Sequence, residues 1–232
     1  MQRYNLDEVF TYNINNKKSR FSILTMKVPT QLNNEIMVSR LILLYESMKY
    51  TSHPEIQKRI LERKNDFNDI LVNIDTKLVR KDWEDIKEDV MYYCLRLGLL
   101  FFPMSIGEIL RETENMDIVE LNKDDDFWGV KRLKGDRSKL VGENVRGKLW
   151  MKLRKFYWDN DYEQILKLEG LDIPNFNILG KKIETIYNPH FKIVCDEKLH
   201  NEEVTINTKK WEKIVIFVLV QTNLSMLKGY FT

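Results

Sequence analysis

A carboxylate, two aromatic rings and a glycine stand together in the stretch DDDFWG, at residues 124–129. The carboxylate of Asp126 can accept hydrogen bonds from the hydroxyl groups of a sugar, and the ring of Trp128 is a flat face on which a base can stack. Gly129 completes this half of a candidate binding site. Each residue also has a structural interpretation, Asp126 as a turn or capping residue and Trp128 as a core tryptophan.

The stretch VGENVRG follows a basic loop and precedes a helical pattern. Asn144, with Gly142 and Gly147 on either side, can place backbone N–H groups at a helix N-terminus, where phosphate is favoured. The same residue types are common helix caps, so the pattern gains its meaning from the neighbouring DDFWG. Glu120, upstream of both stretches, either orients the site or pairs with Arg154 inside the protein.

The loop between the two stretches fits a pyrophosphate, a nucleic-acid backbone or simply solvent. Its basic residues are Lys131, Arg132, Lys134, Arg137 and Lys139. The three histidines of the chain are scattered, and they form neither a metal-ligand spacing nor a Ser-His-Asp order. The sequence therefore predicts no metal and no cofactor.

A single globular domain over residues 1–232 is expected to position these side chains. Hydrophobic residues make up 43% and charged residues 31% of the 232, and a chain of this length buries a core without disulfides or metals. The net charge of +2 is too small to indicate a nucleic-acid partner, so any such contact needs a local patch.

The location expected from the sequence is the cytoplasm, without membrane contact. Cys94 and Cys195 are far apart and Cys94 lies in an apolar run, which favours a reduced intracellular protein. The opening MQRYNLDEVF contains acidic residues and no apolar segment of a signal peptide. The longest aliphatic run, at 214–220, is about a third of what spans a bilayer, and it is expected as a buried strand or helix segment.

Helical periodicity begins at Ser39, a candidate cap, and continues to Tyr50. A second helix is expected over residues 54–64, with Pro54 in its first turn. Further helices are expected at 105–113 and 143–157. Residues 1–37 and the tail from Gly170 alternate more like strands.

The most regular helical pattern is the long segment 83–102, which Asp82 can cap. Its second half, YYCLRLGLLFF, is apolar nearly all round and should form the buried centre of the domain until Pro103 ends the helix. The residues that this places in the core include Leu95, Leu99 and Phe102. The predicted fold is mainly α, or α+β with a small peripheral sheet, around one long central helix.

Three stretches carry a family resemblance: RKDWEDIKEDVMYYCLRLGLLFF, ILRETENMDIVELNKDDDFWGV and VGENVRGKLWMKLR, with YESMKY upstream. In their order and spacing they resemble the NADAR family, also called YbiA-like. Its pattern has an Asp-Trp pair opening a long helix, a Val-Glu pair, an Asp-x-Phe/Tyr-Trp-Gly turn, and Gly-x-Asn-x-x-Gly before a Leu-Met-x-x-Arg helix. The match covers roughly residues 39–157. The later LDIPNFNILGKKI resembles a C-terminal extension, here 170–232, of members that accompany DNA guanine ADP-ribosyltransferase toxins.

The resemblance implies a YbiA-like fold and N-glycosidic chemistry. Family members cleave a ribose from a nitrogenous base, either in riboflavin-pathway intermediates or in guanine bases that carry ADP-ribose, and the latter act as antitoxins. The implied partners are an ADP-ribose-type nucleotide, ADP-ribosylated DNA and a cognate toxin or defence protein, with no metal implied.

The catalytic positions depart from the family pattern. Cleavage of a ribosyl C–N bond passes through a cationic sugar, so a carboxylate near the anomeric carbon is needed. The resemblance implies a Glu in the first helix and a Lys in the long helix, and here those positions hold Ile42 and Gly98. Glu46, one turn after Ile42, can bring a carboxylate into the same pocket or can be a solvated surface side chain. The candidate catalytic residues are therefore Glu46 and Asp126.

Two functions from different classes follow. The first is an N-glycosidase that removes ADP-ribose from guanine in nucleic acid, in an antitoxin or phage counter-defence role. The second is a catalytically silent NADAR-fold protein that binds ADP-ribose or a related nucleotide for sensing or partner regulation. In both, we expect a pocket lined by the first helix, the long helix, the DDFWG turn and the GENVRG helix start.

Overall fold

The structure is a computed structural model that describes residues 1–13, 21, 30–32, 36–62 and 74–188. These residues belong to one compact unit that extends to residue 189. The apolar run at 214–220 lies outside the described residues, as does Cys195.

The first helical region agrees with the predicted positions but not with the predicted cap. Helix α1 covers Leu41–Ser47 and continues as the 3-10 helix η3, Met48–Tyr50. Its cap is Arg40, which makes no side-chain capping bond. Ser39 was expected there, but it lies one residue too early, and its hydroxyl is buried with no hydrogen-bond partner among the described residues. Helix α2, Pro54–Leu61, has its proline in the first turn, as predicted.

The long helix α4, Trp83–Phe101, forms because apolar residues recur along one side of it and then all round it. Leu95 and Leu99 are fully buried and Phe102 is half-buried. Asp82 stands at the cap position, but its carboxylate accepts from the Arg80 guanidinium, at 2.6 and 2.8 Å, instead of from first-turn amides. Pro103 follows the end of α4 and also begins helix α5, Pro103–Glu112.

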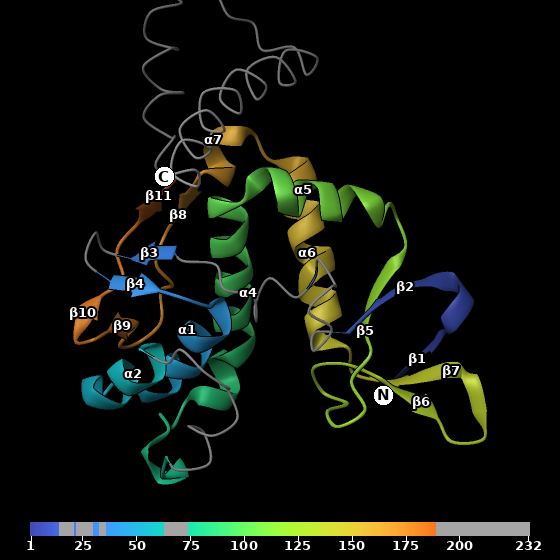
Figure 1. The fold of residues 1–232 in the computed structure, drawn as a ribbon, viewed down its shortest axis with the longest axis horizontal. Coiled ribbons are helices and arrows are strands. Elements are labelled where there is room, and N and C mark those ends of the chain that lie inside the picture. The colour runs from blue at the N-terminus through green and yellow to red at the C-terminus, as the bar shows by residue number, and fades with distance from the viewer. Residues whose placement is uncertain (14–20, 22–29, 33–35, 63–73, 189–232) are drawn as a thin grey trace, which may run out of the picture. The chain divides into compact units, whose positions relative to one another are not determined.

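Two long helices share the interior. Helix α6, Val145–Asp159, packs against α4, and α4 packs against α1 on its other side (Figure 1). Trp150 and Leu153 of α6 are as completely buried as the centre of α4. The buried faces of α1, α4 and α6 therefore form much of the core, and the fold is α+β.

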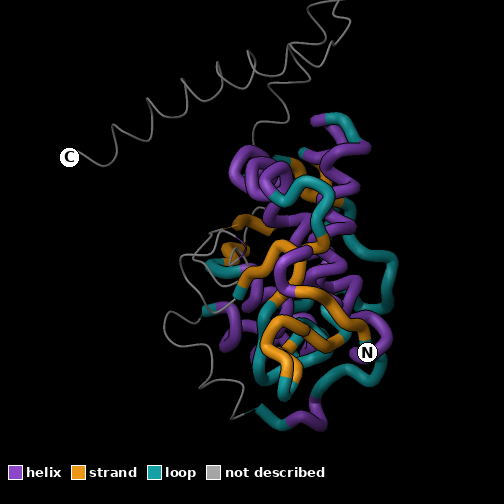
Figure 2. The backbone as a smooth tube through the Cα atoms, turned by 90° about the vertical axis from the view of Figure 1, so that its right-hand side faces the viewer, coloured by secondary structure: helices purple, strands orange, loops and turns teal. Residues whose placement is uncertain are grey.

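Strands cover α6 on the side away from α4, and Figure 2 shows them in front of the helices. Strand β2, Val9–Tyr12, pairs in parallel with the buried strand β5, Asp117–Glu120. Strand β1, Gln2–Asn5, and strand β6, Lys131–Leu133, flank β7, Asp136–Gly142, in an antiparallel sheet. A small separate core lies in this region, formed by Tyr4, Val119, Val130 and Leu140.

Short elements complete the described part of the chain. They are the 3-10 helices η1 (Leu6–Glu8) and η4 (Thr76–Leu78), helix α7 (Tyr162–Ile165), and the strand pairs β3–β4 (Thr30–Leu32, Ile36–Val38), β8–β11 (Lys167–Leu168, Ile186–Tyr187) and β9–β10 (Asn177–Ile178, Lys181–Lys182). No single helix among the described residues is long and apolar enough to cross a membrane. Within the described ranges, only the bent pair of α4 and α5, whose axes differ by 113°, has that length and composition together.

Candidate functional site

The turn that carries Trp128 is built by Asp125. One oxygen of its carboxylate accepts from the backbone N–H groups of Phe127 and Trp128, both at 3.0 Å. Sequence reasoning assigned a turn or capping interpretation to Asp126, but Asp125 performs that task. The Asp126 carboxylate instead pairs with Lys131 at 2.5 Å, and this hydrogen bond and positive charge lower the pKa of Asp126.

The DDFWG turn also caps helix α6. Four successive carbonyl groups of the turn accept from four successive backbone N–H groups at the helix start. The donor and acceptor pairs are Glu143 to Asp126 (2.6 Å), Asn144 to Gly129 (3.2 Å), Val145 to Phe127 (3.0 Å) and Arg146 to Trp128 (3.0 Å). The amides predicted to hold phosphate are thus already used within the protein. A phosphate contact at this helix start stays a prediction, and the structure gives these amides a structural role.

Asn144 joins three segments. It adopts a left-handed conformation, with φ of 53°, and its side chain is fully buried. Its amide oxygen accepts from the Glu120 N–H at 3.1 Å, and its amide nitrogen donates to the Ile118 carbonyl at 2.9 Å. The same nitrogen lies 3.3 Å from the Tyr4 hydroxyl. Asn144 therefore holds β5 and β1 against the start of α6.

The three glycines predicted to bind ligand stand where backbone segments approach closely. A Cβ atom on Gly147 would overlap the Ile118 carbonyl oxygen, and one on Gly142 would overlap the Gly129 carbonyl oxygen. At Gly129, a Cβ atom would lie 2.7 Å from the Glu120 carbonyl oxygen. Their small size is required by packing, and their contact with a ligand stays a prediction.

Glu120 forms a buried ion pair with Arg146. The Arg146 guanidinium contacts both carboxylate oxygens, at 2.5 and 2.6 Å, and the Tyr12 hydroxyl donates to the carboxylate at 3.0 Å. Burial raises the pKa of Tyr12, and the Glu120 charge raises it further, so this hydroxyl remains a donor. Pairing of Glu120 with Arg154 was the other prediction, and it is wrong.

Arg154 lies eight residues after Arg146, about two helical turns further from the start of α6. Its guanidinium donates to the Thr113 hydroxyl at 2.8 Å and to the Met116 carbonyl at 2.9 Å. The partner of Glu120 is therefore set by how β5 is aligned against α6, and the spacing of residues in the sequence did not specify this alignment.

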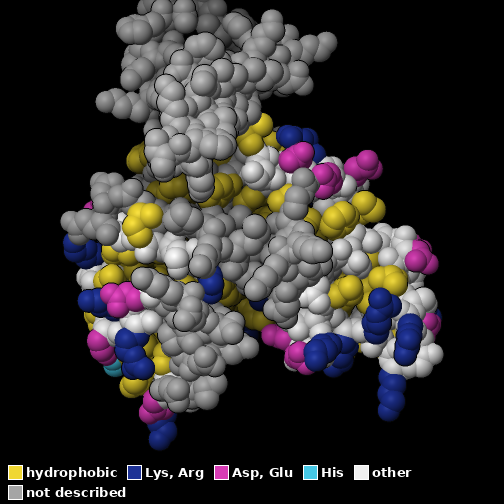
Figure 3. Space-filling model, viewed as in Figure 1, with side chains coloured by type: hydrophobic (Ala, Val, Ile, Leu, Met, Phe, Trp, Pro, Cys, Tyr) yellow, Lys and Arg dark blue, Asp and Glu magenta, His cyan; other side chains and the backbone are white. Residues whose placement is uncertain are grey.

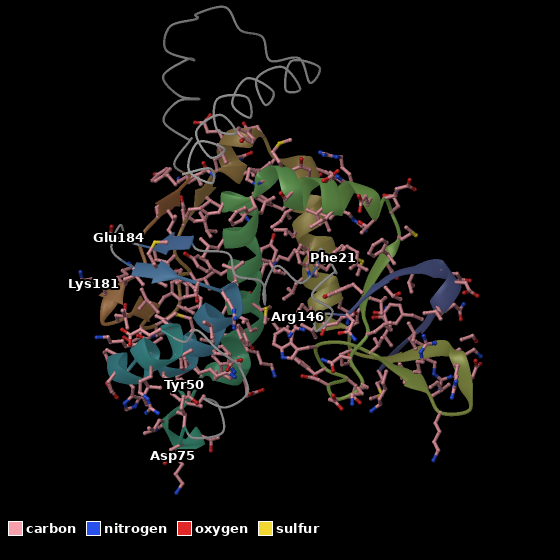
Figure 4. All side chains as sticks on the ribbon, viewed as in Figure 1. Phe21, Tyr50, Asp75, Arg146, Lys181 and Glu184 are labelled. Carbon is pink, nitrogen blue, oxygen red and sulfur yellow. The ribbon has the colours of Figure 1, made fainter. Side chains whose placement is uncertain are left out.

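Five residues from four elements form what we call the aromatic cluster. The Trp128 ring meets the Tyr45 ring edge-on, with 5.8 Å between centroids, and the Arg146 guanidinium lies 5.1 Å from the Trp128 centroid. Tyr45 is 5.1 Å from Trp83, and the Lys49 ammonium lies 5.6 and 5.5 Å from these two rings. Figure 4 shows Arg146 between the α1–α4 side and the turn that precedes β6.

These contacts bring together α1, the start of α4, the DDFWG turn and the start of α6, the four elements predicted to line the pocket. Lys87 of α4, whose ammonium lies 3.9 Å from the Phe127 centroid, adds a second contact between α4 and the turn. Trp128 is half-buried. This tryptophan therefore packs against Tyr45 and keeps part of its surface open.

Glu46 is buried beside the aromatic cluster. Its side chain is 8% exposed and pairs with Lys49 at 2.6 Å. The Glu46 carboxylate acts on groups of both α1 and α4. Burial raises the pKa of Tyr45 in α1 and of the Cys94 thiol in α4, and the negative charge of Glu46 raises both pKa values further. The expectation of a solvated surface carboxylate is therefore wrong. Ile42 and Gly98, at the positions where the resemblance implies a Glu and a Lys, are also buried.

Sequence reasoning missed Lys49 and Arg146. A signal for Arg146 was present, since Glu120 ends the apolar strand DIVE and a buried carboxylate there needs a cation. Lys49 stands three residues after Glu46, a spacing that favours an ion pair on one helix face. No group of three or more His, Cys, Asp or Glu side chains within the described ranges is placed to hold a metal ion.

Comparison with known proteins identifies the class to which this fold and site belong. The sequence profile described as the NADAR domain matches residues 14–158, and the chain belongs to the NADAR family. The match begins earlier than the predicted start near residue 39.

Two individual proteins are similar to the chain. The riboflavin biosynthesis protein PYRR, chloroplastic, of Arabidopsis thaliana is 38% identical over 81 residues, which are 35% of this chain and 12% of that protein. The chain thus spans about an eighth of that relative. The NMR structure of the E. coli protein YbiA is similar in fold, with a TM-score of 0.50 and 21% identity over 68% of this chain and 90% of YbiA.

Proposed function

We propose that the protein is an N-glycosidase that hydrolyses the bond between ADP-ribose and guanine in nucleic acid. The observation that carries the proposal is the buried Glu46 carboxylate beside the aromatic cluster. A carboxylate held in such a place stabilises a cationic sugar more strongly than one in water, because solvent screening is weaker there.

Each residue of the site contacts a different part of the substrate. Trp128 stacks on a base, and Asp126, kept ionised by Lys131, accepts from ribose hydroxyls. Lys49 and Arg146, which pair with Glu46 and Glu120 in the structure, are the cations of the aromatic cluster that would donate to the pyrophosphate. Membership of the NADAR family, which includes N-glycosidase-like members, supports N-glycosidic chemistry.

In the reaction, the C–N bond breaks and its electron pair leaves with the guanine nitrogen, which takes up a proton. Glu46 stabilises the positive charge that develops on the sugar. Water adds to the anomeric carbon and loses a proton, so the products are ADP-ribose and an unmodified base. Repair of this kind suits an antitoxin or phage counter-defence factor, whose partners are ADP-ribosylated DNA and the cognate toxin.

The test is incubation with guanine-ADP-ribosylated DNA, followed by chromatography of released ADP-ribose. We expect release by the unmodified protein and a loss of at least about a hundredfold in Glu46→Gln, which keeps the size of the side chain and removes its charge. Glu62→Gln is the matched control, because Glu62 follows the last residue of α2 and its side chain is 66% exposed. Equal activity of Glu46→Gln and the control would remove Glu46 from the mechanism.

A second candidate function is a catalytically silent binder of ADP-ribose or a related nucleotide. It is favoured by the buried, uncharged Ile42 and Gly98, and by Lys49, which neutralises Glu46 in the structure. Such a protein would bind ADP-ribose in calorimetric titration and release none from modified DNA. Absence of both binding and release would exclude both functions.

A further inference from the structure

The β6–β7 hairpin concentrates positive charge next to the aromatic cluster. Residues 131–139 contain five basic side chains against the one carboxylate of Asp136, a net charge of +4, whereas the whole chain carries +2. All five basic residues are exposed. Figure 3 shows Lys and Arg side chains gathered over this hairpin. The net positive charge of the chain is therefore concentrated in the β6–β7 hairpin.

Three of the five charges are not neutralised by a carboxylate. Lys131 pairs with Asp126 at 2.5 Å and Lys139 with Asp136 at 3.5 Å. The remaining three cations, which have no carboxylate partner within the described part of the chain, are Arg132, Lys134 and Arg137. Exposed cations without a carboxylate partner attract phosphate groups. Their desolvation costs less than that of a buried ion pair, because they remain partly in water.

The hairpin is held in a fixed position relative to Trp128. Strand β7 pairs with β1 as well as β6, and Gly135, with φ of 93°, forms the turn at the tip. Arg132 donates to the Arg137 carbonyl at 2.8 Å across the hairpin. Lys131 follows Trp128 by only three residues, which limits their separation to about 10 Å.

We propose that the β6–β7 hairpin binds the phosphodiester backbone of a nucleic acid strand and thereby presents a base of that strand to Trp128. Phosphates recur every few ångströms along a strand, so several fall within reach of one hairpin. The partly exposed Trp128 ring offers a stacking face for a base, which an acidic polypeptide lacks. The inference rests on the proposed function only where the presented base carries ADP-ribose. Binding of the nucleic acid backbone itself requires no hydrolysis.

The test measures binding of the full chain to unmodified, fluorescently labelled DNA of about 20 nucleotides, single- and double-stranded, at about 50 to 200 mM salt. The variant is R132Q/K134Q/R137Q. The control, K58Q/R59Q/K155Q, removes the same number of exposed charges from α2 and α6, where Lys58 and Lys155 pair with Glu62 and Asp159. Polyglutamate is the acidic polypeptide probe, and calorimetric titration with ADP-ribose reports whether the proposed ligand site is intact.

We expect the hairpin variant to weaken binding to DNA and to lower the slope of log K against log salt by about 2 for single strands, since each phosphate contact contributes about 0.7. The control should keep both values, and ADP-ribose binding should be unchanged in both variants. The two forms of DNA then show which strand state is preferred.

An unchanged salt slope in the hairpin variant would overturn the proposal, as would an equal loss in the control. Tighter binding of polyglutamate than of DNA would also overturn it and would assign the hairpin to an acidic protein. Absence of ADP-ribose release by the unmodified protein would count against the proposed function alone, because these measurements use unmodified DNA.

Discussion

The side chain of Arg146 lies between a carboxylate and an aromatic ring. Glu120 holds its guanidinium through two short contacts, and the Trp128 ring lies 5.1 Å away. The ion pair is buried, so its net contribution to stability is small, but it fixes where the positive charge lies. Glu120 therefore fixes the position of Arg146 beside the half-buried Trp128 ring, and in the proposed function that ring is the surface that meets a ligand.

At the residue scale, Trp128→Ala should weaken ADP-ribose binding by roughly 1–3 kcal/mol, about five- to a hundredfold, because one stacking face is lost. Calorimetric titration measures the change. Trp158→Ala is the control, since Trp158 is 47% exposed at the far end of α6 and should leave the affinity unchanged. Equal affinities of the two variants would mean that Trp128 serves packing alone, through its contacts with Tyr45 and Phe127.

At the scale of elements, the DDFWG turn and the start of α6 form one structural unit. The turn carbonyls satisfy the helix amides, and Asn144 connects the same helix to β5. Helix starts with exposed amides attract anions, but these amides already have partners. The pairing of the two sequence motifs therefore reflects mutual capping, which in turn positions Trp128 and Arg146.

Gly147→Ala tests this close packing. Alanine favours a helix over glycine by about 1 kcal/mol, yet its Cβ would overlap the Ile118 carbonyl and the Asn144 side chain. We expect a net destabilisation of roughly 1–3 kcal/mol, measured by urea denaturation. Lys148→Ala, at the next and exposed position, should change stability by less than about 0.5 kcal/mol. A stabilised Gly147→Ala variant would show that β5 can move away from α6.

At the scale of the whole molecule, the segment after α6 extends the family domain. Gln57 of α2 donates to the Asn177 carbonyl at 3.0 Å and accepts from the Leu179 N–H at 2.7 Å. Asn188 donates to the Leu100 carbonyl at 2.6 Å, and the Phe176 ring packs edge-on against Tyr93. Residues beyond the NADAR match thus cover α2 and α4.

Truncation tests the contribution of this segment. A chain that ends after residue 159 loses the cover of α4, including the buried Phe176 and Ile178, and each large buried side chain contributes about 1.5–3 kcal/mol. Because a domain's total stability is about 5–15 kcal/mol, we expect no cooperative thermal unfolding from this fragment. A chain that ends after residue 189 should unfold cooperatively, since it keeps the whole compact unit. Circular dichroism on heating distinguishes the two, and cooperative unfolding of the shorter chain would contradict the prediction.

Several features were determined by the sequence alone. The helices α2, α4 and α6 follow from local periodicity and proline placement, which act within a few residues. The family resemblance rests on motifs such as DDFWG and GENVRG, which are also local in the chain. These properties need no knowledge of which segments meet.

Only the tertiary structure decided what those residues contact. Glu120 pairs with Arg146 rather than Arg154, and Glu46 is buried rather than solvated. Asp125, rather than Asp126, builds the turn. The Asp125 turn is local, whereas the partner of Glu120 and the burial of Glu46 depend on how segments far apart in the chain pack together. Periodicity fixes the face of an element, and only packing fixes its partner.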